Sequence, residues 1–144
     1  MARKFIITSA IVAAIGFASA PAMANGLLIE QFGWGNSAGG GQAGFGNLIG
    51  VHQNGVVNGA VAEQFGNHNV AAIGQQGFNN AADTFQHGNW NQVGVGQFGA
   101  NHTAVMSQDG HGNIAAGVQI GNGCNAVASQ SGAGNTAAFV QVCP

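Results

Sequence analysis

A glutamine recurs at every eleventh residue from residue 31 onward, without a slip or an insertion. These residues are Gln31, Gln42, Gln53, Gln64, Gln75, Gln86, Gln97, Gln108, Gln119, Gln130 and Gln141. A fixed period sustained over this length is typical of repeat architectures, in which each unit packs only on its neighbours. The fold therefore has to be built from this repeated unit, which starts at each Gln and ends before the next.

Other positions of the unit are also fixed when residues are counted from each Gln. The second place is Gly in ten units: Gly33, Gly44, Gly55, Gly66, Gly77, Gly88, Gly99, Gly110, Gly121 and Gly132. The fifth place is Asn in eight units: Asn36, Asn47, Asn58, Asn69, Asn80, Asn91, Asn113 and Asn135. The seventh place is Ala in eight units. The unit reads Gln-x-Gly-x-x-Asn-x-Ala-x-x-x.

An odd period requires a device that resets the alternation of side chains along a strand. The two variable residues after Gly, such as Phe78 and Asn79, are where this reset is expected. Gly and Asn flank that pair, and both residue types accept the positive φ values of a sharp corner. Each unit is thus predicted to form a strand of about seven residues and a tight arc. A helix fits poorly, because Gly in every unit destabilises it.

One face of each strand is predicted to point inward. It holds the fifth, seventh and ninth places and the repeated Gln, as in Asn69, Ala71, Ile73 and Gln75. The ninth place is mostly apolar across the chain. The four acidic residues all fall on other places: Glu30, Glu63, Asp83 and Asp109. This pattern keeps charge off the inner face.

Two such units close one coil, so that each residue stacks on its equivalent two units further along the chain. We therefore predict an all-β fold, a β-solenoid of about five coils with two strands per coil. Like amides then form columns, and an amide that carries both a donor and an acceptor can hydrogen-bond along such a column. The repeat runs through both ends of the solenoid, so we predict uncapped ends and head-to-tail stacking of copies.

The composition excludes several classes of function. Only 4% of the residues are charged, against about 25% in ordinary domains. Arg3 and Lys4 are the only basic residues, so no cationic surface exists for nucleic acid and we predict no nucleic-acid partner. The acidic residues are scattered through different columns, and no paired carboxylates or Ser-His-Asp set is formed. We predict no enzymatic activity and no cofactor.

Residues 1–24 have the pattern of a signal peptide. Arg3 and Lys4 provide the basic start, residues 5–20 the apolar run, and residues 22–24 the small-x-small cleavage site. We expect cleavage before Asn25 and a single repeat domain over residues 25–144. The exported chain carries four acidic side chains and no Lys or Arg.

The repeated unit resembles the curlin repeat, the building block of curli, which are functional amyloid fibres of bacterial biofilms. The resemblance covers residues 25–142 and rests on Gln, Gly, Asn and Ala recurring in phase. It implies export through an outer-membrane secretion pore, nucleation by a nucleator subunit, and an extracellular fibre at the cell surface. It also implies roles in adhesion and biofilm matrix, and makes the Gln, Gly and Asn columns the core positions.

The best-known major curlin has a non-repeat secretion segment after its signal peptide, and no such segment precedes Asn25. The sequence therefore does not identify the signal that the secretion pore would recognise. The last repeat bears on the type of subunit. Nucleating minor subunits often end in a basic repeat, whereas residues 137–144 contain no Lys or Arg. The sequence favours a fibre-forming major subunit, with the minor nucleating subunit as an alternative.

Cys124 and Cys143 are the only cysteines, and export favours their oxidation. Cys124 occupies a fifth place and Cys143 a second place two units later, so both flank the same arc in adjacent coils. We predict a disulfide between them. A zinc site with His102 is disfavoured, because structural zinc usually has four protein ligands.

The rival interpretation is a soluble β-solenoid that binds ice or glycans through one flat face. Ice binders of this shape usually present Thr columns, whereas Thr103 and Thr136 stand alone in theirs. His52, His68, His87 and His111 occupy outward or arc places and are expected to be solvated. Phe32, Trp34 and Phe98 are among the aromatic residues expected at arc or outward places.

Overall fold

The computed structural model describes residues 25–144, and the predicted signal peptide lies outside the described residues. Eleven strands follow one another, joined by two-residue to four-residue turns. They are β1 (Gly26–Trp34), β2 (Ser37–Ala43), β3 (Leu48–Val56), β4 (Gly59–Asn67), β5 (Val70–Phe78), β6 (Ala81–Asn89), β7 (Gln92–Ala100), β8 (Thr103–His111), β9 (Ile114–Asn122), β10 (Asn125–Ala133) and β11 (Thr136–Cys143).

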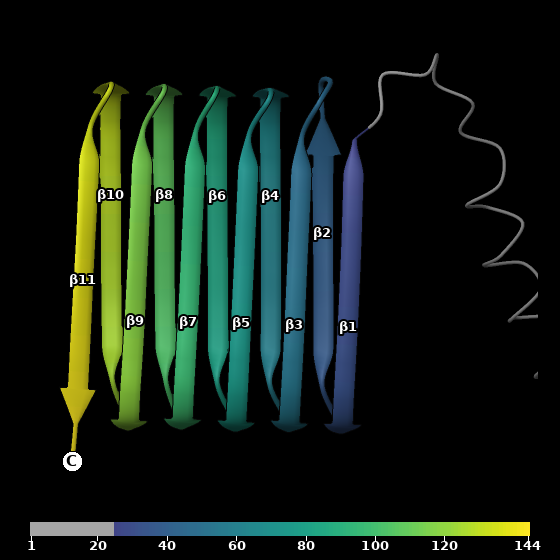
Figure 1. Cartoon of the computed structure of the whole chain (residues 1–144), viewed down its shortest axis with the longest axis vertical. Helices are drawn as coiled ribbons and strands as arrows, with labels where there is room; N and C mark the ends of the chain where they lie inside the picture. Colours follow the sequence, from purple (N-terminus) through teal and green to yellow (C-terminus); the bar gives the residue numbers. More distant parts are fainter. Residues whose placement is uncertain (1–24) are drawn as a thin grey trace, which may run out of the picture.

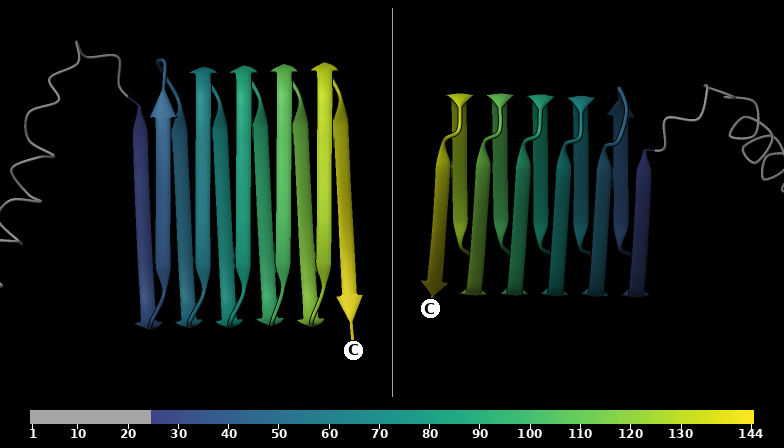
Figure 2. Two further views of the ribbon diagram at one scale, coloured as in Figure 1. Left: turned by 180° about the vertical axis from the view of Figure 1, so that it is seen from behind. Right: turned by 45° about the horizontal axis from the view of Figure 1, so that its top comes forward.

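The strands form two parallel sheets that face each other. The odd-numbered strands make a six-stranded sheet in the order β1-β3-β5-β7-β9-β11, and the even-numbered strands make a five-stranded sheet. Figure 1 shows the two sets alternating along the stack, and Figure 2 shows the same stack from behind and with its top forward. The predicted all-β solenoid of about five coils, with two strands per coil, is confirmed.

The register advances by two repeat units in every strand pair. Gln53 pairs with Gln75, and Gln75 pairs with Gln97. In the other sheet Gln64 pairs with Gln86 in the same manner. Every strand pair among the described residues keeps this step, which confirms that two successive units close one coil.

The core lies between the sheets and consists of the inner places of the repeat. Its apolar members come from the seventh and ninth places: Ile49, Val51, Ala60, Ala62, Ala71, Ile73, Ala82, Val93, Val95, Ala104, Met106 and Ala115. The four acidic residues are exposed on the outer faces. The inner face of the described residues therefore contains no carboxylate.

The strands are longer than predicted. Most contain nine residues instead of about seven, because pairing continues through the second-place Gly and one residue beyond it. The turn is correspondingly shorter, as at Asn79 and Asn80 between β5 and β6.

The corner residues also differ from the prediction. Positive φ values occur at the second-place Gly and again at the fourth place, as at Gly77 (131°) and Asn79 (54°). The fifth-place Asn residues do not take positive φ. At the fourth place several units use residues for which this region is sterically unfavourable, including Val57 and Trp90. The expectation that the fifth-place Asn acts as a turn former was therefore wrong, and its side chain has a different role.

One core position is polar without a partner. Thr84 occupies a ninth place and is buried, yet its hydroxyl has no hydrogen-bond partner among the described residues. A buried unpaired hydroxyl costs about 1–3 kcal/mol. We expect Thr84→Val to raise the free energy of unfolding by about 1 kcal/mol, because it keeps the shape and removes the unpaired group. Denaturant unfolding of the two proteins side by side measures this, and an unchanged or lower midpoint for Thr84→Val would contradict it.

Candidate functional site

The repeated glutamines form two hydrogen-bonded ladders that run along the axis of the stack. In the six-stranded sheet the Nε2 group of each Gln donates to Oε1 of the Gln one coil further on, as from Gln53 to Gln75 (2.7 Å) and from Gln75 to Gln97 (2.8 Å). The five-stranded sheet has an equivalent ladder, as from Gln64 to Gln86 (2.7 Å). The interior members of both ladders are fully buried.

The interior glutamines other than Gln108 also tie the two sheets together. The second Nε2 hydrogen of Gln75 is donated to the backbone carbonyl of Gly59, which belongs to the opposite sheet (2.8 Å). Gln86 makes the same contact with Val70 (3.1 Å) and Gln97 with Ala81 (2.8 Å). One amide thus satisfies both of its donors and accepts from the coil before it. This explains why the position requires Gln, since no other side chain of this length both donates twice and accepts.

The fifth-place asparagines form corner ladders. Asn69 Oδ1 accepts the backbone N–H of Asn91 (3.0 Å), and Asn69 Nδ2 donates to the carbonyl of Gly88 (2.8 Å). The first bond spans one coil and the second connects a fifth place to the second-place Gly of the next coil. These bonds satisfy the backbone groups of the turns, which are otherwise left unpaired at a sharp corner.

The second-place glycines are required by close approach of adjacent coils. A Cβ added at Gly55, Gly77 or Gly99 would lie 1.9 Å from the carbonyl oxygen of the next coil. The same positions have φ between 131° and 136°, a region that is essentially restricted to Gly. Both reasons apply in every internal coil, which explains why ten units share this residue.

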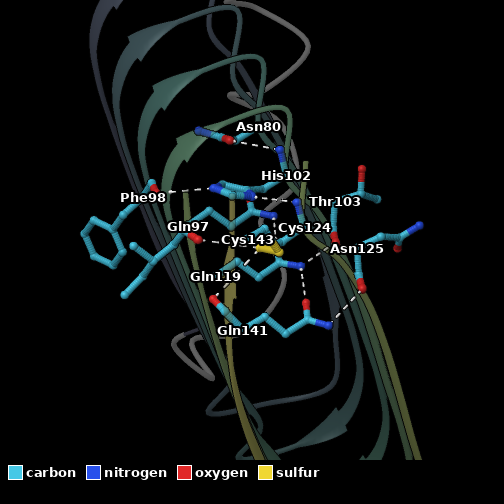
Figure 3. Close-up of a disulfide and its surroundings, with 11 residues drawn as sticks. Asn80, Gln97, Phe98, His102, Thr103, Gln119, Cys124, Asn125, Gln141 and Cys143 are labelled. Carbon is cyan, nitrogen blue, oxygen red and sulfur yellow. Dashed lines mark hydrogen bonds between the residues drawn. A yellow bond between two sulfur atoms is a disulfide. The ribbon is translucent and has the colours of Figure 1, made fainter. Parts of the chain in front are cut away.

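His102 replaces one asparagine and reproduces half of its function. The Cys124 backbone N–H donates to Nδ1 of His102 (3.1 Å), and His102 Nε2 lies 3.2 Å from the Phe98 carbonyl (Figure 3). Because Nδ1 accepts, the bonded form is the neutral ring with its proton on Nε2, which donates to Phe98. His102 is fully buried. The corner ladder thus continues through a non-amide side chain.

Cys124 and Cys143 are joined by a disulfide in the next turn of the same corner (Figure 3). They are 19 residues apart, the same separation as the Asn-to-Gly hydrogen bond of the other coils. The covalent bond therefore stands where a hydrogen bond stands elsewhere, and it fastens β11 to the coil beneath it.

This geometry predicts the effect of losing the disulfide. Closing a loop of about this length stabilises a protein by roughly 3 kcal/mol in the chain-entropy model. We expect Cys124→Ser to loosen β10 and β11 and leave the central coils unchanged. Hydrogen exchange read by mass spectrometry measures this, and Ser129→Ala serves as a control in β10. Equal protection of residues 125–143 in the two variants would contradict it.

The remaining histidines lie outside the ladders. His52 is 3.3 Å from Glu30 and His87 is 2.9 Å from Asp109, both as exposed pairs one coil apart. His68 is half-buried instead of solvated, because it stacks on Trp90 (4.2 Å between ring centroids) and meets the edge of Phe45. The sequence did not predict these contacts, because the residue types involved follow no repeat, although the three side chains lie in successive coils.

The two ends of the stack differ from its interior in exposure. Leu27 and Ile29 of β1 are 55% and 37% exposed, whereas their register partners Ile49 and Val51 in β3 are 0% and 2% exposed. No helix or loop of residues 25–144 covers the outer edges of β1, β2, β10 or β11. Each end presents core side chains and strand edges that the interior coils bury.

The arrangement defines a class of protein: a two-sheet parallel β-solenoid that is held together by side-chain amide ladders and is open at its ends. Residues 77–110 match the family model described as the curlin associated repeat. This match confirms the predicted resemblance to the curlin repeat, and the structure shows the same unit in phase on either side of the matched segment. The comparison with curated proteins gave no significant match.

Among the described residues no helix is long and apolar enough to cross a membrane. In the same part of the chain no cluster of three or more His, Cys, Asp or Glu residues has the geometry of a metal site. The curlin repeat and the solenoid fold point to a structural protein of the curli type.

Proposed function

We propose that this chain is a secreted structural subunit that assembles head to tail into curli-like amyloid fibres for biofilm matrix and surface adhesion. The observation that carries the proposal is the exposure of Leu27 and Ile29 at one end, at positions that every internal coil buries. A second copy stacked in register buries these side chains and pairs the open strand edges.

The ladders support assembly as well as folding. Gln130 and Gln141 stand at the last position of the two Gln ladders, and each still donates to a backbone carbonyl of the opposite sheet. Each also accepts a hydrogen bond from the preceding Gln of its ladder, Gln130 from Gln108 (2.8 Å) and Gln141 from Gln119 (3.0 Å). Interior glutamines donate their second Nε2 hydrogen to the next coil. Gln31 and Gln42 at the other end carry the matching acceptors. A second copy extends both ladders without rearrangement.

The curlin resemblance supports the remaining parts of the proposal. Residues 1–24 direct export and are removed, and residues 25–144 form the repeat domain. The exported chain passes an outer-membrane secretion pore, starts assembly on a nucleator subunit, and remains as an extracellular fibre at the bacterial surface. The last repeat, which contains no Lys or Arg, favours the major subunit over the nucleator.

The proposal is tested by incubating the purified processed chain and following thioflavin-T fluorescence together with electron microscopy. We expect fluorescent fibres that seed further growth. Discrete particles that stay dye-negative for days would contradict fibre formation and favour the soluble binder of ice or glycans. An ice-recrystallisation assay and a glycan array on those particles would then separate the two soluble functions.

A further inference from the structure

At both ends of the stack the outermost strand belongs to the same sheet. The eleven strands of residues 25–144 are odd in number, so the six-stranded sheet begins with β1 and ends with β11. The five-stranded sheet ends one half-coil earlier at each side, with β2 and β10. Figure 1 shows β1 and β11 as the outermost strands at opposite ends. Each end is therefore a step, at which the six-stranded sheet extends one strand beyond the five-stranded sheet.

Two such steps fit together in only one orientation. If the next copy stands in the same orientation, its β1 meets β11, and β10 faces the next copy's β2 across the gap of one missing strand. If the next copy is turned by half a turn about the stack axis, its β1 fills the recess above β10 and its β2 pairs with β11. The half turn also reverses the strand direction, so the new pairs remain parallel, as all pairs inside the molecule are.

We propose that successive copies in the fibre are related by a half turn about the fibre axis, with β1 of one copy on β10 of the preceding copy and β2 on β11. The inference rests on the proposed head-to-tail fibre and specifies its interface. Gln130 then meets the next copy's Gln31, and Gln141 meets the next copy's Gln42. Within the chain, successive repeat units lie in alternate sheets. The half turn continues this alternation from the last unit of one copy to the first unit of the next.

The sizes of the core side chains support the same orientation. Phe139 of β11 is accommodated because its register partner is Gly117, where an added Cβ would lie 2.2 Å from the ring. In the half-turn arrangement the next residue of this column is the next copy's Gly40, so the ring lies between two glycines. Ala128 of β10 then meets the next copy's Ile29. Without the half turn, Phe139 meets Ile29, which places large on large, and Ala128 faces Gly40 across the gap of the missing strand.

The half turn also determines the surface of the fibre. The outer faces of both sheets expose apolar residues, such as Leu28, Leu48 and Phe98 on the six-stranded sheet and Val61, Phe65 and Phe85 on the five-stranded sheet. The outer face of the five-stranded sheet carries three of the four acidic residues: Glu63, Asp83 and Asp109. Successive copies present these faces alternately on each side. Each side of the fibre then carries the three acidic residues of every second copy.

Cross-linking of paired cysteines on the outer faces distinguishes the two orientations. In the half-turn fibre Ser129 lies beside the next copy's Glu30, at a strand spacing of about 4.8 Å that suits a disulfide. In the unrotated fibre Val140 lies beside Glu30, and Ser129 is on the opposite face. The variants Ser129→Cys with Glu30→Cys and Val140→Cys with Glu30→Cys are therefore controls for each other. All three positions are exposed.

We expect fibres of the Ser129 pair to give a ladder of covalent multimers after mild oxidation and non-reducing electrophoresis, and fibres of the Val140 pair to give monomers. Multimers from the Val140 pair, from both pairs or from neither would overturn the half turn while fibre formation stands. Absence of fibres from the unsubstituted chain would instead overturn the proposed function.

Helical reconstruction of fibres of the unsubstituted chain by electron cryo-microscopy provides a measurement that needs no variant. Eleven half-coils per copy predict an axial rise of about 26 Å with a rotation near half a turn, given a strand spacing of about 4.8 Å. The unrotated arrangement leaves one strand missing and gives about 29 Å with almost no rotation. That second result would contradict the proposal.

Discussion

Gly77→Ala is expected to abolish the folded solenoid or to lower its free energy of unfolding by about 4 kcal/mol. Two independent costs add at this position. The φ of 131° lies in a region that side chains rarely adopt, and the new Cβ would lie 1.9 Å from the carbonyl oxygen of Gly99. That carbonyl is backbone and is held by the corner hydrogen bond from Asn80 (3.1 Å). The strain therefore cannot be relieved by a rotamer change.

Gly74→Ala is the matched control, because it lies in the same strand and adds the same methyl group. Gly74 has no positive φ, and its nearest atom to an added Cβ is the Val95 carbonyl oxygen at 4.0 Å. Far-UV circular dichroism and the denaturant midpoint of the freshly purified proteins compare the two. Equal midpoints for Gly77→Ala and Gly74→Ala would show that the coils are not stacked as closely as the structure places them.

Gln75→Glu is expected to be the most damaging substitution that leaves side-chain size unchanged. Gln75 donates to Gln97 Oε1 (2.8 Å) and to the Gly59 carbonyl (2.8 Å), and it is 1% exposed. A carboxylate cannot donate, so at neutral pH it would face two acceptors while carrying a buried charge. Breaking a buried polar arrangement in this way costs about 4 kcal/mol.

The pH dependence of this variant has a defined sign. Burial disfavours the charged carboxylate, so the introduced Glu binds a proton more readily in the folded state than in the unfolded state. Its destabilisation is then largest at neutral pH and decreases as the pH falls, because the protonated carboxyl regains one donor. Gln76→Glu is the control, since Gln76 is the adjacent, exposed residue of the same strand. A loss of stability common to both variants, or independent of pH, would contradict the ladder.

The fold could be predicted from the sequence because single residue types, such as Gln, recur at a fixed period. The invariant step of Gln specifies the register, and the ninth place separates inner from outer faces without reference to structure. The Gln and Gly columns follow directly from stacking every second unit. These inferences succeed because each depends on one place of the repeat. Equivalent places have the same surroundings in successive coils, so the same residue type is selected in each.

The details that the sequence did not predict depend on contacts between positions. Asn69 bonds to Gly88 and Asn91 in the next coil, so its selection reflects cross-coil hydrogen bonds and not its own backbone conformation. The positive φ at Val57 is imposed by the corner against the preference of Val. The stacking of His68 on Trp90 arises from two residues, one coil apart, whose types follow no repeat.

The central claim, that each residue lies over its equivalent two repeat units further along the chain, is tested most directly by solid-state nuclear magnetic resonance of fibres with labelled Phe98 and Ile120. These residues point outward in β7 and β9 and are register partners. The structure predicts a strong through-space contact between the Phe98 ring and the Ile120 methyl groups. His87 and Asp109 lie one repeat unit away from Phe98, on the opposite outer face. A contact of Phe98 with either of them in place of the contact with Ile120 would contradict the claim.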